Sequence, residues 1–302
     1  MKTPLIALTT DFGESDPFVG IMKGVISGIA PGVSLVDITH AIPPGDIQRG
    51  AIVLWQSAPY FPPGTVFLAV VDPGVGTKRK GIILYAQGRI FVGPDNGLFS
   101  YLLVEGENAQ AWELADTLLG DLHSSAVDLQ PSAVDLQPSA VNLQPSATFH
   151  GRDVFAPSAA RAALGVKGAE FGEKCPHLAR LPFPSLEVIS TRELRGEIVT
   201  IDQFGNLLTS LGRFVPAEDE QLQLFPWLGQ HLPMVKFSLD KARVLLPDGQ
   251  SLPFVNTFAQ VSPGNCAALI GSTGLIEIVA NRQSSANILK LKRGSQISLK
   301  FT

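Results

Sequence analysis

An apolar run at positions 64–71, rich in β-branched residues, constrains the fold more than any other segment of this chain. A short run of this kind, bounded by glycine and proline, predicts a strand that is buried on both faces. Asp72 follows the run directly and opens a loop with one proline and two glycines. We therefore expect the Asp72 carboxylate at the sheet edge where open α/β folds bind their ligands.

Strand and helix patterns alternate around this run. The spacing of apolar residues predicts strands at 5–9, 33–38, 66–71, 81–85 and 89–92, and helices over 19–29, after Asp46, around 98–103 and over 153–164. Such alternation is typical of α/β proteins. We therefore predict an N-terminal Rossmann-like α/β/α domain with a mostly parallel sheet.

The pattern changes after the Pro182-Phe183-Pro184 segment. Short alternating runs predict strands at 197–201, 207–210, 235–238, 242–246, 267–270 and 276–279, and helical patterns are nearly absent. This pattern of short alternating runs predicts an all-β barrel or sandwich domain. A chain of 302 residues is long enough for two domains, which we place at 1–180 and 186–302.

A seven-residue unit, Ser-Ala-Val-Asp-Leu-Gln-Pro, begins at position 125, recurs at 132, and returns at 139 with Asn142 replacing its aspartate. Each unit ends in proline, and a proline at every seventh residue excludes a continuous helix. We interpret 125–146 as a loop insertion in the N-terminal domain without a role in its chemistry, because long surface loops are tolerated.

Composition excludes several classes of partner. The formal net charge is −4 and there is no long basic run, so we expect neither nucleic-acid nor anionic-membrane binding. No apolar run approaches the roughly 18 residues of a membrane span, and the N-terminal apolar stretch is too short for a signal peptide. The two cysteines, Cys175 and Cys266, lie far apart, which argues against a disulfide framework or a zinc site. We expect a cytoplasmic protein.

Three residues could form a water-handling set at the sheet edge. Arg79 lies seven positions after Asp72, so the loop could fold back and pair the two side chains. His150 lies in the segment Phe-His-Gly-Arg-Asp after the insertion. A carboxylate and an imidazole can orient a water and accept its proton during attack. The alternatives are a solvated Asp72 in a Pro-Gly turn and a structural His150.

Other polar residues are candidates for substrate binding. Asp11 ends the first strand, where it could accept hydrogen bonds from ribose hydroxyls or cap the following helix. In the second domain, the loops at 201–209 and 271–278 place polar groups beside glycine, where they could hold an amino acid or a base, or only form turns. Neither a GxGxxG signature nor a P-loop is present, which argues against phosphate binding.

Taken in order, these segments resemble the S-adenosylmethionine (SAM) hydrolase family, also called SAM hydroxide adenosyltransferases, whose relatives include fluorinase and chlorinase. The resemblance rests on Thr10–Gly13, Val36–His40, Val71–Thr77, Pro94–Gly97, Thr148–Asp153, Asp202–Asn206 and Ser272–Glu277. It implies cleavage of SAM to adenosine and methionine by water or hydroxide attack at the ribose C5′. SAM is then the substrate, and neither metal nor cofactor is implied.

The resemblance also implies roles for individual residues. Asp72, Arg79 and His150 match the water-handling trio, and Asp11 matches the carboxylate that binds the ribose diol. The remaining substrate-binding residues that it implies are Asp202 and Ser272 at the methionine ammonium, Asn206 with the backbone at Val279 and Ala280 at adenine, and Phe258, Thr273 and Glu277. Phe258 stands where the family often has tyrosine, and Thr273 where fluorinase has arginine. The resemblance further implies a homotrimer whose active sites combine one subunit's N-terminal domain with its neighbour's C-terminal domain.

Several functions remain open at this point. Fluorinase-like sequences carry tyrosine in place of Asp72 and Tyr-Ser in place of His150-Gly151. A halide requires a dry, neutral pocket, and Asp72 would repel it, so the residues favour hydrolysis over halogenase-like transfer. Another alternative is a divalent-metal phosphohydrolase that uses oxygen ligands, drawn from Asp11, Asp16, Asp72, Asp95 and Asn96. The third alternative is a nonenzymatic protein that binds SAM or adenosine as a sensor.

Overall fold

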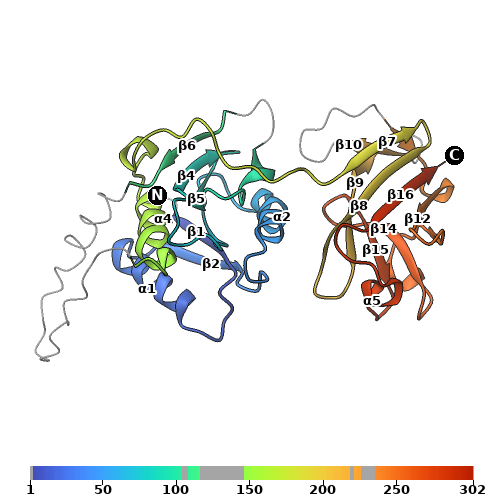
Figure 1. The fold of residues 1–302 in the computed structure, drawn as a ribbon, viewed down its shortest axis with the longest axis horizontal. Coiled ribbons are helices and arrows are strands. Elements are labelled where there is room, and N and C mark those ends of the chain that lie inside the picture. The colour runs from blue at the N-terminus through green and yellow to red at the C-terminus, as the bar shows by residue number, and fades with distance from the viewer. Residues whose placement is uncertain (1–2, 104–107, 116–145, 218–220, 226–234, 302) are drawn as a thin grey trace, which may run out of the picture. The chain divides into compact units, whose positions relative to one another are not determined.

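The computed structural model describes residues 3–103, 108–115, 146–217, 221–225 and 235–301 (Figure 1). The predicted insertion at 125–146 lies outside these residues, except for its last position, Ser146. The chain divides into two compact units, Met1–Leu181 and Pro182–Thr302. Among the described residues, no helix combines the length and the apolar character needed to cross a bilayer.

A six-stranded mixed sheet forms the centre of the first unit. Its spatial order is β2-β1-β3-β5-β4-β6, with β1 (Leu5–Thr10), β2 (Ser34–Thr39), β3 (Val66–Val70), β4 (Gly81–Ala86), β5 (Arg89–Pro94) and β6 (Gln110–Glu113). Strands β2, β1, β3 and β5 run parallel, whereas β4 is antiparallel to both of its neighbours. The strand predicted from the opening apolar run is β3, which is buried throughout between β1 and β5.

Helices cover both faces of this sheet (Figure 1). Alternate residues of each strand point to opposite faces. Leu68 and Val70 of β3 therefore pack in one hydrophobic cluster with α1 (Phe18–Ile29) and α4 (Ala156–Ala163). Phe67 and Ala69 pack in another with α2 (Ile47–Ser57). The predicted α/β/α arrangement is confirmed.

Local capping explains where some of these elements begin. The Asp46 carboxylate accepts a hydrogen bond from the Arg49 backbone N–H (3.0 Å) and caps α2, as the sequence predicts. The helix expected around 98–103 is reduced to a single 3₁₀ turn, η2 (Ser100–Leu102). There the Ser100 hydroxyl donates to the Gly97 carbonyl (2.6 Å), a local bond that competes with helix formation.

The second unit is built on antiparallel strands and confirms the predicted all-β class. A ten-stranded sheet follows the order β11-β10-β9-β8-β16-β12-β13, with β7 on β8 and the β14–β15 pair on β9. Its strands are β7 (Leu186–Ser190), β8 (Glu193–Ile201), β9 (Leu207–Pro216), β10 (Leu222–Phe225), β11 (Lys236–Phe237), β12 (Ala242–Leu245), β13 (Ser251–Pro253), β14 (Cys266–Ile270), β15 (Leu275–Ala280) and β16 (Gln296–Phe301). Strands β7, β10, β13 and β16 were not predicted from the sequence.

The remaining helical elements are short. They are α5 (Ser285–Leu289), the π-helical turn η3 (Gly151–Phe155) that leads into α4, and the 3₁₀ turns η1 (Ala58–Tyr60), η4 (Gly168–Glu170), η5 (Leu239–Lys241) and η6 (Phe258–Gln260). The helix expected over 153–164 is therefore interrupted near its start, where η3 precedes α4. π-helical turns are rare and occur frequently at functional sites.

Candidate active site

Asp72 and Arg79 form a buried ion pair at the carboxyl end of β3. The Arg79 Nε donates to both carboxylate oxygens of Asp72 (2.9 and 3.0 Å), and the Arg79 Nη2 also donates to Oδ2. The two side chains are only 4% and 10% exposed, respectively. The contact expected from their spacing is present. A buried carboxylate remains ionised when a guanidinium binds it at two atoms.

The loop between these two residues is shaped by its glycines. Gly76 has φ +75°, and a Cβ at that position would lie 2.5 Å from the Ala147 carbonyl oxygen. The Thr77 backbone and hydroxyl groups both donate to the Gly74 carbonyl (3.1 and 2.7 Å). The loop therefore folds tightly and packs against the segment that immediately precedes His150.

His150 completes the set from the N-terminus of η3. Its Nδ1 lies 2.7 Å from the Arg79 Nη2. Because a guanidinium can only donate, this nitrogen accepts, and the neutral ring carries its proton on Nε2. The Arg79 guanidinium also lies over the Phe155 ring, 5.2 Å from its centroid. The structure thus brings together the three residues predicted to handle water, with Arg79 between the other two.

Asp11 directly follows β1 (Leu5–Thr10), close enough to Asp72 for the charge of Asp72 to affect the pKa of Asp11. Its Oδ2 accepts a hydrogen bond from the Gly45 backbone N–H (2.8 Å). Burial raises the pKa of Asp11, and the negative charge of Asp72 raises it further. The alternative that Asp11 caps the next helix is wrong, since Pro17 is the N-cap residue of α1.

Asp95 and Asn96 support loops at the same sheet edge. The Asn96 side chain donates to the Val71 carbonyl (2.8 Å) and accepts from the Leu98 N–H (3.2 Å), which fixes the backbone just before Asp72. Asp95 Oδ1 accepts from the Ala179 N–H (2.8 Å), and burial raises the pKa of Asp95. Within the described ranges, no group of three His, Cys, Asp or Glu residues has an arrangement that could hold a metal ion.

Three aromatic rings form a cluster that was not predicted from the sequence. Phe12, Phe18 and Phe149 pack edge to face, with centroid separations of 5.9, 5.9 and 5.1 Å. Phe12 follows Asp11 in the chain and Phe149 precedes His150, so the cluster ties the two loops together. The only available signal was a phenylalanine directly beside Asp11 and another directly beside His150.

In the second unit, Asp202 shapes its own loop. Its Oδ1 accepts from the backbone N–H groups of Phe204 and Asn206 (2.8 and 2.9 Å), and its Oδ2 accepts from the Asn206 side chain (2.8 Å). Gly205, with φ +83°, completes the turn. Asn206 is buried and directly precedes β9. Asp202 therefore orients the Asn206 amide.

The backbone at Val279 and Ala280 borders this loop. Pairing between β15 and β9 ends at Ile278 and Leu207, whereas pairing between β15 and β14 continues through Ala280. Antiparallel register therefore places Val279 beside Asn206, on a backbone edge that β9 does not cover. Val279 and Ala280 are themselves buried, at 0% and 4% exposure. Their backbone N–H and C=O groups are of the kind that could read a planar base.

Glu277 and Thr273 contribute buried polar atoms near the turn at 271–274. Burial raises the pKa of Glu277, and the charge of Asp202 adds to this effect. A Cβ on Gly271 would lie 1.9 Å from the Glu277 Oε1, so a larger residue there would displace the Glu277 carboxylate. Within the described part of the chain, the buried Thr273 Oγ1 has no hydrogen-bond partner. Ser272 and Phe258 are exposed.

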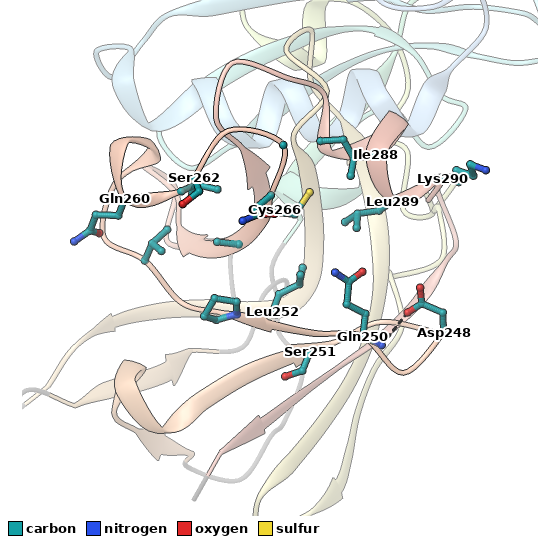
Figure 2. A pocket seen from close by; sticks show the side chains of 16 residues that line it. Asp248, Gln250, Ser251, Leu252, Gln260, Ser262, Cys266, Ile288, Leu289 and Lys290 are labelled. Carbon is teal, nitrogen blue, oxygen red and sulfur yellow. Dashed lines mark hydrogen bonds between the residues drawn. The ribbon is translucent and has the colours of Figure 1, made fainter.

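The second unit also contains a cavity of about 560 Å³ (Figure 2). Asp248, Gln250, Cys266 and Lys290 are among its sixteen lining residues. None of the predicted substrate-binding residues lines it. Burial raises the pKa of the Cys266 thiol, which keeps that thiol protonated. This cavity is therefore separate from the set of candidate residues.

Comparison with known families covers both units. A family model described as the SAM hydroxide adenosyltransferase N-terminal domain matches residues 6–172, and the corresponding C-terminal domain model matches residues 196–298.

Individual relatives match along nearly their whole length. A Thermus thermophilus protein named (R)-S-adenosyl-L-methionine hydrolase is 38% identical over 96% of this chain and 97% of its own. A fluorinase from Actinoplanes sp. is 26% identical over 98% of this chain and 97% of its own. The crystal structure of an uncharacterized conserved protein from Thermotoga maritima matches with a TM-score of 0.76 and 30% identity, covering 98% of this chain and 99% of that one.

We predict that Gly76→Ala lowers the free energy of unfolding by about 1–3 kcal/mol, because alanine disfavours positive φ and its Cβ would clash with the Ala147 carbonyl. Gly74→Ala is the matched control: its Cβ would meet only ordinary contacts at 3.4 Å in the same loop. Urea denaturation of both variants measures the difference. Equal free energies of unfolding for the two variants would show that neither the positive φ nor the close approach of Ala147 requires glycine at position 76.

Proposed function

Because this chain belongs to the SAM hydroxide adenosyltransferase family, we propose that it hydrolyses SAM to adenosine and L-methionine, with Asp72, Arg79 and His150 handling the attacking water. One observation carries this assignment of residues. A buried carboxylate, a guanidinium and an imidazole are hydrogen-bonded in series at the carboxyl end of β3.

In the proposed reaction, a water oxygen attacks the ribose C5′ of SAM and forms the new O–C5′ bond. The C5′–S bond breaks, and its electron pair neutralises the sulfonium, so methionine leaves as a neutral thioether. The water proton passes to Asp72 and then to solvent. The leaving group needs neither protonation nor a metal ion, since the positive charge on sulfur already makes C5′ electrophilic.

Asp72 supplies the proton acceptor in this scheme. Bulk water has a pKa near 15.7, far above the range of a carboxylate, so the water is not deprotonated in advance. Instead Asp72 orients the water and takes the proton as the O–C5′ bond forms. Arg79 holds both carboxylate oxygens, which fixes their direction and keeps Asp72 ionised in a buried position.

His150 has a different role from Asp72 in the proposed reaction. Its Nδ1 is occupied by Arg79, so that nitrogen does not serve as a base. The neutral ring carries its proton on Nε2, a donor that can stabilise negative charge developing on the attacking oxygen. Arg79 thus sets the roles of both partners: it leaves Asp72 as the acceptor and makes His150 a donor.

The substrate-binding residues complete the proposal. Asp11 accepts hydrogen bonds from the ribose hydroxyls, and Asn206 with the backbone at Val279 and Ala280 binds adenine. At the other end of the substrate, the methionine group is bound by Asp202, Ser272, Thr273 and Glu277, and Phe258 packs on the ligand. We propose that the two units supplying these residues come from neighbouring subunits of a homotrimer.

Hydrolysis is favoured over halide transfer by the same residues. Asp72 is ionised and buried, and a halide at this position would meet like charge without the compensation of water. The relative named as a hydrolase is also more similar to this chain than the one named as a fluorinase, at 38% against 26% identity.

Chromatography of products from the purified protein and SAM tests the function directly. We expect adenosine and methionine, in amounts unchanged by EDTA and without 5′-chloro-5′-deoxyadenosine when chloride is added. Chlorinated product would favour the halogenase alternative. Loss of activity in EDTA would point to a metal-dependent hydrolase, and adenosine binding without turnover would point to a sensor.

We expect Asp72→Asn to lower kcat by about 100-fold or more, because an amide cannot take the water proton, while adenosine affinity changes by less than about threefold. Steady-state kinetics and calorimetry separate the two quantities. Asp95→Asn is the control at the same sheet edge, since an amide oxygen can still accept the Ala179 N–H. Turnover by Asp72→Asn at the parent rate would show that Asp72 does not handle the water.

Because the pKa of Asp11 is raised, we expect the KM for SAM to depend on pH in the acidic range, which we call the acid limb. As the pH falls through that pKa, Asp11 gains a proton and loses one of its acceptor sites for the ribose hydroxyls, so KM for SAM rises. Burial moves this limb to a higher pH than an ordinary aspartate would give. Asp11→Asn should have a high KM at neutral pH that no longer rises through this range. A limb that persists in Asp11→Asn would assign it to another group.

A further inference from the structure

His40 is a buried histidine that the mechanism above does not use. It directly follows β2 and is only 3% exposed. Its Nε2 lies 3.0 Å from the Asp37 Oδ1, and its Nδ1 lies 2.8 Å from the Thr10 Oγ1. A buried imidazole with both nitrogens hydrogen-bonded is held in one orientation and supplies fixed attachment points.

The directions of these bonds follow from the partners. Burial alone would raise the pKa of Asp37, but hydrogen bonds from Lys23 and His40 outweigh it, so that pKa lies below its usual value. Asp37 is therefore an ionised acceptor, and the His40 proton lies on Nε2. The remaining nitrogen, Nδ1, accepts from the Thr10 hydroxyl. Lys23 on α1 donates to the other Asp37 oxygen (2.5 Å), which holds the carboxylate in place.

His40 holds the backbone on both sides of Asp11. Through its ring it fixes Thr10, whose hydroxyl oxygen accepts from the Phe12 N–H (3.3 Å). Through its carbonyl it accepts from the N–H of Gly13 (2.8 Å), a residue with φ +69°. The Asp11 carboxylate thus projects from a short turn that is tied to one residue at each end.

The loop leaving His40 reaches Asp11 from the other direction. It ends at Gly45, whose N–H donates to the Asp11 Oδ2 (2.8 Å). Gly45 has φ +72° and lies close to Pro73, the residue after Asp72. Of the two segments that determine where the Asp11 carboxylate lies, the turn is therefore bonded to His40 at both ends and the loop begins at His40.

We propose that His40 is a positioning residue for substrate binding: by fixing the turn and the loop around Asp11, it sets that carboxylate for the ribose hydroxyls. It acts through Asp11 and not on the attack by water. The inference rests on the proposed function in one respect only, the assignment of Asp11 to the ribose.

Thr10→Val tests this role with little change in shape, since it removes the hydroxyl that joins His40 to the turn. We expect a rise of about fivefold in the adenosine Kd and in the KM for SAM, the size expected for one hydrogen bond, with kcat within twofold of the parent. Thr9→Val is the matched control. Thr9 is equally buried in the same strand, but its Oγ1 has no hydrogen-bond partner within the described ranges, so its loss should leave Kd and KM unchanged.

A double-mutant cycle with Asp11→Asn separates positioning from general destabilisation. If His40 acts through Asp11, Thr10→Val should cause little further loss of adenosine affinity once the carboxylate is gone. Calorimetry of the parent, the two single variants and the double variant closes the cycle, and urea denaturation confirms that each is folded.

Each outcome decides the proposal. An unchanged Kd in Thr10→Val, an equal loss in the Asp11→Asn background, or a fall in kcat with unchanged Kd would overturn it. Failure of the parent to bind adenosine would overturn both the positioning role and the proposed function. Adenosine binding with the expected cycle, but without hydrolysis of SAM, would refute the proposed function and support the positioning role of His40.

Discussion

The ion pair between Asp72 and Arg79 is the interaction on which the candidate site depends. A carboxylate that is 4% exposed at the end of a fully buried strand would be costly to ionise without a partner. Arg79 supplies that partner from within the same loop and also bonds the imidazole of His150. One guanidinium thereby joins the central strand to the segment that follows the repeats, and fixes the hydrogen-bonding state of both neighbours.

Much of this arrangement could be predicted from the sequence because its determinants are local. The buried strand, the Pro-Gly loop and the seven-residue spacing were enough to predict that Arg79 folds back onto Asp72. Asp46 likewise caps α2 as expected, since an N-cap acts only three residues along the chain. The strands missed in the second unit are short or partly exposed, so their apolar alternation is weak; β7, for example, is largely exposed.

The unpredicted parts depend on residues far apart in the sequence. Neither Thr10 nor His40 carries a signal that the two will meet, because 30 positions separate them and parallel pairing of β1 and β2 brings them together. The same is true of Gly76, whose need for glycine comes from Ala147 across the repeat insertion. Asp202 could be recognised from the sequence only as a polar residue in a glycine turn. Its bonds to Phe204 and Asn206 show that it also shapes the loop.

The charge of the four candidate residues Asp11, Asp72, Arg79 and His150 is matched to the proposed substrate and not to its products. Asp11 and Asp72 set two carboxylates against the single guanidinium of Arg79, and His150 is neutral because Arg79 occupies its Nδ1. One net negative charge therefore remains. A sulfonium is attracted to such a site, an incoming halide is repelled, and adenosine is neutral. Cleavage of the C5′–S bond removes the attraction at the step that forms product. The same electrostatics can thus favour substrate capture, hydrolysis over halide transfer, and product release.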